Sequence, residues 1–134
     1  MRGQAAVEYM AMIGILLAIL LPLAAYVWQS NSTSSAVQQA TMTADKIANT
    51  ADSLWAQGPG AQNTINVYFP PGYNASRSSL NNTMVRLSIH ISAGNTDIVS
   101  TTKANLTGTL PSSPGYAWLI MRTMDNYVTV STVS

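Results

Sequence analysis

The most apolar part of the chain lies near its N-terminus, where the twenty residues from Tyr9 to Trp28 carry no charge. At about 1.5 Å of rise per residue, a helix of this length covers roughly 30 Å, the thickness of a bilayer's hydrocarbon core. Tyr26 and Trp28 close the run, as aromatic residues do at membrane interfaces. Arg2 is the only basic residue before it, which favours a cytoplasmic N-terminus. Pro22 is expected to bend or loosen the helix.

A polar break and an amphipathic helix follow the apolar run. Residues Gln29 to Ser35 prefer caps and turns to helix interiors. Beyond them, apolar residues recur at alternating spacings of three and four, which is one stripe of an amphipathic helix. The stripe consists of Val37, Ala40, Ala44, Ile47, Ala51 and Leu54, while Asp45, Lys46 and Asp52 are interpreted as a solvated face. We expect the helix to end at the Gly-Pro-Gly sequence of residues 58–60.

From about Asn63 to the C-terminus the hydrophobic period changes to two. Ile65–Phe69 and Val85–Ile91 alternate apolar and polar residues and predict half-buried strands. Residues 116–122 and 127–133 predict a closing hairpin. The Thr- and Ser-rich stretch from Thr96 to Leu110 predicts one or two weaker strands.

These patterns predict an α+β fold with a long N-terminal helix and a small antiparallel β-sheet head. A sheet this small buries little core alone, so the helical stripe is expected to cover it. The predicted arrangement resembles a lollipop. Its helix spans residues 4–57, apolar over 4–28 and amphipathic over 34–57, and its head spans residues 63–134.

Composition narrows the function classes. Only 8 % of residues are charged and the formal net charge is +1, with no basic patch to hold phosphates, so a nucleic-acid partner is not predicted. Cysteine is absent, which excludes disulfides, thiolate metal sites and cysteine nucleophiles. We find no catalytic triad, paired carboxylates, phosphate loop or metal cluster, and we predict neither an enzyme nor a cofactor.

The start of the chain differs from an ordinary secretory signal, because the apolar run is too long and no small-residue cleavage site follows Trp28. A plain membrane anchor explains the run but leaves Glu8 unexplained. A carboxylate at the edge of an apolar span is costly unless it is paired or reaches the interface, and such residues are functional candidates.

Residues Arg2-Gly3-Gln4-Ala5-Ala6-Val7-Glu8-Tyr9, followed by the apolar run, resemble the class III signal of archaeal type IV pilin precursors. That family has a short basic leader ending in Gly, then Gln, three small or apolar residues, Glu, Tyr and a hydrophobic helix. The resemblance covers about residues 2 to 21. Bacterial Tad-type pilins and pseudopilins share a related start, but Gln4 and the sequons favour the archaeal group.

The resemblance implies that a prepilin peptidase cuts between Gly3 and Gln4, so that residues 1–3 are a leader and Glu8 becomes the fifth mature residue. Glu8 and Tyr9 would then serve assembly. The implied partners are the pilus assembly machinery and further copies of the chain in a helical filament. The precursor would lie in the cytoplasmic membrane with its head outside, and the mature subunit in an extracellular filament for adhesion or surface attachment. A minor pilin or pseudopilin, and a membrane-anchored surface domain that never polymerises, remain alternatives.

Four sequons for N-glycosylation occur, at Asn31, Asn74, Asn81 and Asn105. Asn74 and Asn81 are expected in a loop between two strands, where a glycan finds room. His90 is expected on the polar face of its strand, as a surface residue. The aromatic residues of the head are expected mostly in the core or at subunit contacts, with an adhesive patch as the lesser interpretation.

Overall fold

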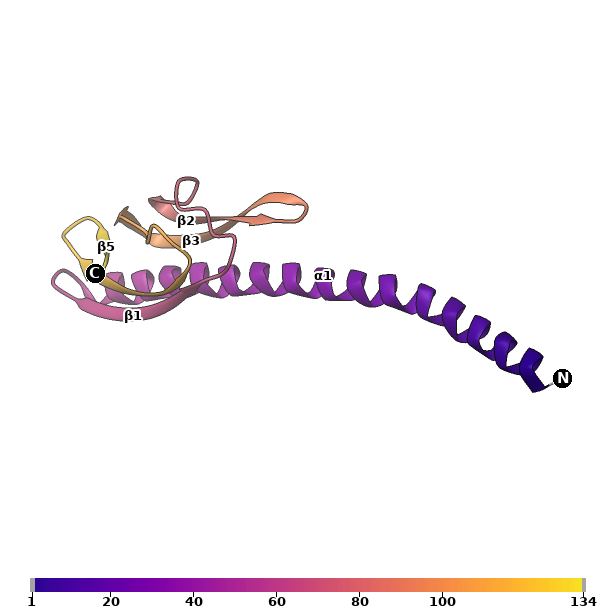
Figure 1. The fold of residues 1–134 in the computed structure, drawn as a ribbon. Helices are drawn as coiled ribbons and strands as arrows, with labels where there is room; N and C mark the ends of the chain where they lie inside the picture. Colours follow the sequence, from indigo (N-terminus) through magenta and orange to yellow (C-terminus); the bar gives the residue numbers. More distant parts are fainter. Residues whose placement is uncertain (1, 134) are drawn as a thin grey trace. The chain divides into compact units, whose positions relative to one another are not determined.

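The computed structural model describes residues 2–133, and for Arg2 the backbone alone. Met1 of the expected leader lies outside this range. One α-helix and five β-strands make up the described chain (Figure 1). They are α1 (Arg2–Gln57), β1 (Gln62–Phe69), β2 (Ser79–Ile91), β3 (Gly94–Gly108), β4 (Gly115–Thr123) and β5 (Val128–Thr132). The predicted α+β class, a long apolar N-terminal helix followed by a small sheet, is confirmed.

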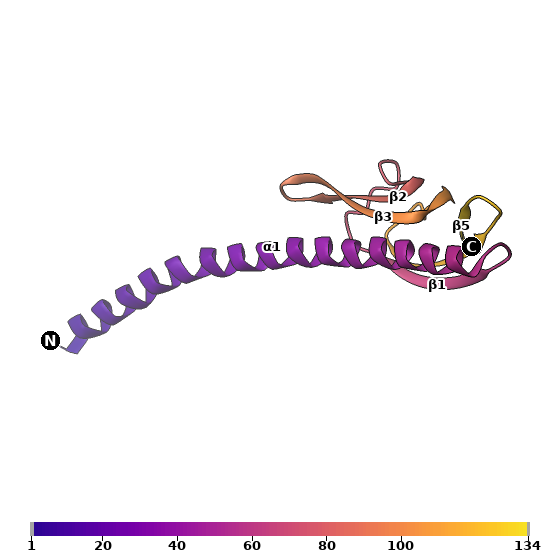
Figure 2. The same ribbon diagram turned by 180° about the vertical axis from the view of Figure 1, so that it is seen from behind.

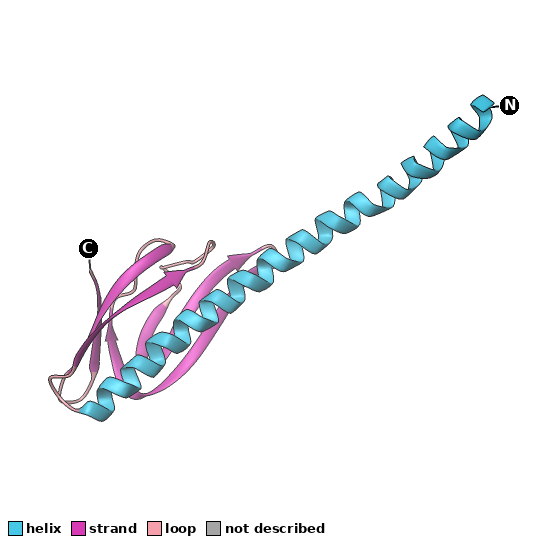
Figure 3. Cartoon of the chain, turned by 90° about the horizontal axis from the view of Figure 1, so that it is seen from below, coloured by secondary structure: helices cyan, strands magenta, loops and turns pink. Residues whose placement is uncertain are grey.

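The chain divides into two compact units, the first ending at Ser34 and the second beginning at Ser35. The second unit holds the sheet and the last part of α1, so the head includes residues 35–57 of the helix as well as the expected range 63–134. Within this unit the helix runs along one face of the sheet (Figures 2 and 3).

The predicted polar break at Gln29–Ser35 is wrong, because α1 continues through it. The side-chain hydroxyls of Ser32 and Thr33 donate to the backbone carbonyl of Gln29, at 2.9 and 3.2 Å. Because these hydroxyls bond to a carbonyl of the preceding turn, they do not interrupt the backbone hydrogen bonds of the helix. The helix also continues through Pro22. It ends at Gln57, just before the expected Gly-Pro-Gly sequence, and the φ of 91° at Gly58 suits the residue that follows a helix.

The sheet has the order β1-β4-β5-β3-β2. The pairs β1–β4, β4–β5 and β2–β3 are antiparallel, and the predicted closing hairpin is β4–β5. The expectation of a wholly antiparallel sheet is wrong, because β5 runs parallel to β3 where Leu106–Gly108 pairs with residues 128–130. The Thr- and Ser-rich stretch forms one long strand, β3. After β4 the chain turns back, and β5 inserts between β4 and β3, parallel to β3. Gly108 permits this contact, since a Cβ there would collide with the Val130 carbonyl.

The core of the second unit lies between the stripe on α1 and the inner face of the sheet. The stripe is buried from Ala40 onward, whereas Val37 is half-buried. Small alanines bring the helix close to the strands. The largest buried side chains on the sheet side are Phe69, Leu87, Ile89, Leu119 and Met121.

The charged face of the helix does more than meet solvent. Lys46 Nζ donates to the Asn66 carbonyl at 2.7 Å, and Thr43 Oγ1 donates to the Tyr68 carbonyl, so the helix covers the outer edge of β1. Asp52 Oδ1 accepts the backbone N–H groups of Lys103 and Ala104 at 2.7 and 3.3 Å. These two groups belong to a part of β3 that pairs with neither neighbouring strand. The β2–β3 register shifts there, and pairing with β5 begins only at Leu106 of β3. The prediction of a solvated face holds for Asp45 and Lys46, which are exposed, whereas Asp52 is half-buried and bonds to β3.

We expect Asp52→Ala to lower the free energy of unfolding by about 1–3 kcal/mol, because it leaves two strand N–H groups without their acceptor. Thermal or urea unfolding of the full chain in mild detergent measures this. Asp45→Ala is the matched control on the same helix. Asp45 accepts only from the exposed Ser100 hydroxyl, at 2.9 Å, which water replaces readily. Equal losses in the two variants would contradict the role given to Asp52.

Tyr73 supplies a pH-dependent contribution to stability. Its ring packs against Phe69 with centroids 4.7 Å apart, its hydroxyl donates to the Pro111 carbonyl at 3.1 Å, and burial raises its pKa. The unfolded chain therefore ionises Tyr73 at the ordinary value near 10 while the native chain keeps it neutral. We expect stability to be retained below about pH 10 and to fall as the pH rises through the native pKa. Denaturant titrations from pH 8 to 11 should show a shallower fall in Tyr73→Phe, and identical slopes would contradict this account.

Candidate functional site

The clearest functional feature is the surface of α1 in the first unit. Every residue from Gly3 to Ser32 is exposed. This includes every large apolar side chain from Val7 to Trp28, among them Met10 at 78 % and Trp28 at 80 % exposure. The helix is long and apolar enough to cross a membrane, and none of its most apolar stretch is buried. An apolar surface of this extent requires lipid or another protein around it.

Gly3, Gln4, Glu8 and Tyr9 all lie on the first turns of α1 and are all exposed. Gln4 and Glu8 are four positions apart and therefore lie on the same side of the helix. The structure brings the four predicted residues together within two turns, at the end where the apolar run begins.

Two glycines in this segment, Gly3 and Gly14, have open space where a side chain would lie. Gly3 and Gly14 are helical, and a Cβ at either position would meet nothing within 4 Å. Gly14 lies in the helix interior, where glycine costs about 1 kcal/mol relative to alanine. Neither glycine is therefore needed for packing inside the described chain.

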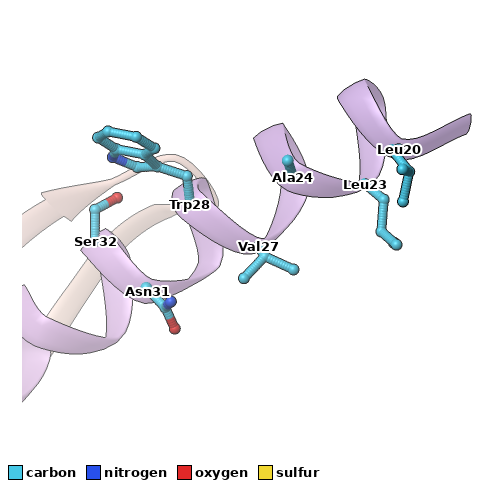
Figure 4. Close-up of a pocket in the computed structure, with 7 residues that line it drawn as sticks. All are labelled: Leu20, Leu23, Ala24, Val27, Trp28, Asn31 and Ser32. Carbon is cyan, nitrogen blue, oxygen red and sulfur yellow. The ribbon is translucent and has the colours of Figure 1, made fainter. Parts of the chain in front are cut away.

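A shallow depression follows one side of the same helix, around the end of the apolar run. Figure 4 shows the seven side chains that line it, which recur at spacings of three and one along α1; they are Leu20, Leu23, Ala24, Val27, Trp28, Asn31 and Ser32. Rows at this spacing form the ridges and grooves through which helices pack on one another. The lining residues are apolar up to Trp28 and polar after it, so the apolar surface of the helix ends at Trp28.

On the head, the aromatic residues divide into two groups. Phe69 and Tyr73 are buried, as expected for core residues. Tyr116 and Trp118 are exposed by 79 % and 53 % on β4, and the Tyr116 ring packs at a tilt against that of Tyr68, with centroids 4.8 Å apart. Phe69 and Tyr73 thus meet the expectation of a place in the core, whereas a role of the exposed Tyr116 and Trp118 in subunit contacts stays a prediction.

The polar side chains of the head form local pairs. His90 is exposed, as predicted, and its Nδ1 lies 3.0 Å from Asn95 Oδ1. Arg86 pairs with Asp97 across the β2–β3 ladder, and its hydrogen bonds lower the pKa of Asp97. Such exposed pairs contribute little to stability. Within residues 2–133 there is no cluster of three or more metal-ligating side chains.

The sequons occupy four different environments. Asn31 lies inside α1, Asn74 in the turn before β2, Asn81 within β2 and Asn105 within β3. The prediction that Asn81 lies in a loop is wrong, because β2 begins at Ser79. The early part of β2 is polar and its apolar alternation starts only at Val85, which is why sequence periodicity placed the strand too late.

Comparisons with known proteins leave these features without a relative to interpret them: no protein-family model, no curated protein and no solved structure matches the chain.

Proposed function

We propose that the chain is the precursor of a type IV pilin-like subunit, which loses residues 1–3 and polymerises through its N-terminal helix into an extracellular filament for adhesion or surface attachment. One observation carries the proposal. A wholly exposed apolar helix begins with Gly3, Gln4, Glu8 and Tyr9 at the spacing of the class III signal, and it is joined to a head with its own core.

The exposed helix suits a segment that has two successive environments. Lipid surrounds its apolar side chains in the precursor, and the same side chains contact other copies of the helix after assembly. Burying one leucine or isoleucine contributes about 1.5–3 kcal/mol relative to leaving it in water. Neither environment leaves the run from Tyr9 to Trp28 in water, so extraction from the membrane and assembly occur together.

The two glycines fit processing and packing. A peptidase must approach the backbone closely, and Gly3 offers no side chain to obstruct it. Gly14 lies in the apolar run, where small residues let helices approach one another in membranes and bundles. Within the chain, both positions have space for a side chain, which is consistent with glycine being required there by the peptidase and by neighbouring helices.

Glu8 supplies register in this proposal. Cleavage after Gly3 creates an α-amino group on Gln4, and a neighbouring subunit's Glu8 neutralises it among apolar side chains. Leaving one partner of such a pair alone costs about 3–5 kcal/mol. A subunit docked at the wrong height leaves both charges unpaired, so the pair selects one stagger between helices.

We expect the protein recovered from cell surfaces to begin at Gln4, because the apolar run has to survive for assembly. Intact-mass and N-terminal peptide measurements should show loss of Met1 to Gly3. Gly3→Val should retain the leader, since its branched side chain obstructs the peptidase while meeting nothing in the chain itself. A mature start after Trp28 would refute the proposal and indicate an ordinary secreted protein.

We expect Glu8→Gln to insert and to be cleaved but to yield at least tenfold fewer filaments, because the neighbour's amine is left without a carboxylate at a cost of several kcal/mol. Filament yield is measured by quantifying the subunit in sheared surface fractions and by negative-stain microscopy. Glu8→Asp keeps the charge and serves as the matched control.

Processing is measured in the same Glu8 variants, because the peptidase also encounters this residue. Normal filaments from fully processed Glu8→Gln protein would refute the pairing. Processed protein that stays in the membrane in every variant, wild type included, would favour the membrane-anchored surface domain.

A further inference from the structure

The four sequons differ in whether their reacting groups are free. N-glycosylation joins a sugar to the asparagine Nδ2, and the Ser or Thr hydroxyl two residues later is needed for recognition of the sequon. A usable site therefore has to present both groups, on a backbone that an enzyme is able to reach.

Asn31 and Asn105 fail this requirement. Asn31 lies inside α1, and the hydroxyl of its Thr33 donates to the Gln29 carbonyl at 3.2 Å. Asn105 Nδ2 is itself engaged, donating to the Asn126 carbonyl at 3.3 Å. Its Thr107 lies in the parallel ladder opposite Thr129, so the backbone of this sequon is held between two strands.

Asn74 fails for a different reason. Its Oδ1 accepts both the backbone N–H of Ser76, at 3.2 Å, and the Ser76 hydroxyl, at 2.7 Å. Its backbone N–H donates to the Ser88 carbonyl at 2.8 Å, and its carbonyl accepts from Ser78. The residue is half-buried, and although its Nδ2 makes no hydrogen bond within residues 2–133, its Oδ1, the Ser76 hydroxyl and the backbone of this sequon are all engaged in the turn.

Asn81 differs from the other three. Asn81, Asn82 and Thr83 are all exposed, and the side chains of Asn81 and Thr83 make no hydrogen bond to any other residue in the range 2–133. Asn82 has a φ of 47°, the one positive value among the described residues other than glycine, and the β2–β3 register shifts between Asn82 and Met84. The backbone therefore leaves regular strand geometry within this sequon.

The position of β2 adds access from the side. β2 is an edge strand, and the preceding loop bonds to it only at Ser88 and His90. Among residues 2–133, none bonds to the outer edge around Asn81, whereas the opposite edge strand, β1, is covered by Thr43 and Lys46 of α1. An enzyme can thus reach the side chains and the backbone of this sequon in the folded head.

We propose that Asn81 is the residue of this chain that carries an N-linked glycan. The proposal rests on the proposed function in one respect, that the head is exported. The co-reactant is a sugar activated by a phosphate or diphosphate leaving group on its anomeric carbon. The Asn81 Nδ2 forms a bond to the anomeric carbon while the bond between that carbon and the phosphate oxygen breaks. The phosphate leaves with the electron pair, and one amide proton passes to a base of the transferase.

A glycan at this place also protects the uncovered edge. Unpaired N–H and C=O groups on an edge strand are a template for pairing with another chain, and bulges and bulky polar groups prevent it. The bulge at Asn82 and a sugar on Asn81 act on the same stretch of β2, which no segment among residues 2–133 bonds to from outside the sheet.

Each sequon lies in its own tryptic peptide, because cleavage falls after Lys46, Arg77, Arg86, Lys103 and Arg122. In protein purified from its native host, we expect the peptide of residues 78–86 to carry a sugar mass and the peptides containing Asn31, Asn74 and Asn105 to be bare. Asn81→Gln and Thr83→Ala should remove the mass, while Thr83→Ser and the matched control Asn74→Gln should retain it. A bare Asn81 peptide, whether or not another sequon is modified, would overturn the assignment.

Microscopy of the same preparation separates this proposal from the proposed function. Filaments whose subunits have bare Asn81 would refute the glycan alone. A glycan on Asn81 of a chain that stays in the membrane and forms no filaments would support the assignment and refute the filament.

Discussion

The N-terminal half of α1 presents an apolar surface that must be kept from water, and the rest of the account depends on this constraint. From Val7 to Trp28 every large apolar side chain is exposed in the chain alone. The segment spans roughly the thickness of a bilayer, so lipid is able to cover it. In the proposed function a filament offers the same side chains a second partner of similar polarity, and Glu8 selects one alignment among many nearly equivalent apolar contacts.

The head is independent of that constraint because it closes its own core. Residues from Ala40 to Leu54 turn a small-residue stripe toward the sheet, and polar side chains on either side of the stripe complete the contact. Lys46 covers the edge of β1, and Asp52 accepts the N–H groups that β3 cannot give to another strand. One continuous helix thus has two surfaces, the first left for an outside partner and the second used within the chain.

Much of this was predictable from the sequence, and the failures have physical causes. The change of period from 3.6 to two located the helix stripe and β1 because burial on one face imposes that alternation. The predicted break was wrong because the hydroxyls of Ser32 and Thr33 bond to the Gln29 carbonyl, which lets a polar stretch remain helical. The parallel pairing of β5 with β3 depends on strand order, which no local pattern encodes. The positions of Glu8 and Gly3 were readable from spacing, whereas the difference among the sequons required hydrogen bonds between residues.

The central claim is that the apolar helices of different subunits pack on one another in the assembled protein. A single engineered thiol tests this claim directly, because the chain has no cysteine of its own. Ala18→Cys exchanges one small side chain for another in the middle of the apolar run. A short bismaleimide cross-linker applied to sheared surface material should convert this variant into covalent dimers. The membrane fraction of cells lacking the assembly machinery should give monomers. Monomers alone in both fractions, or no variant in the sheared material at all, would contradict the account.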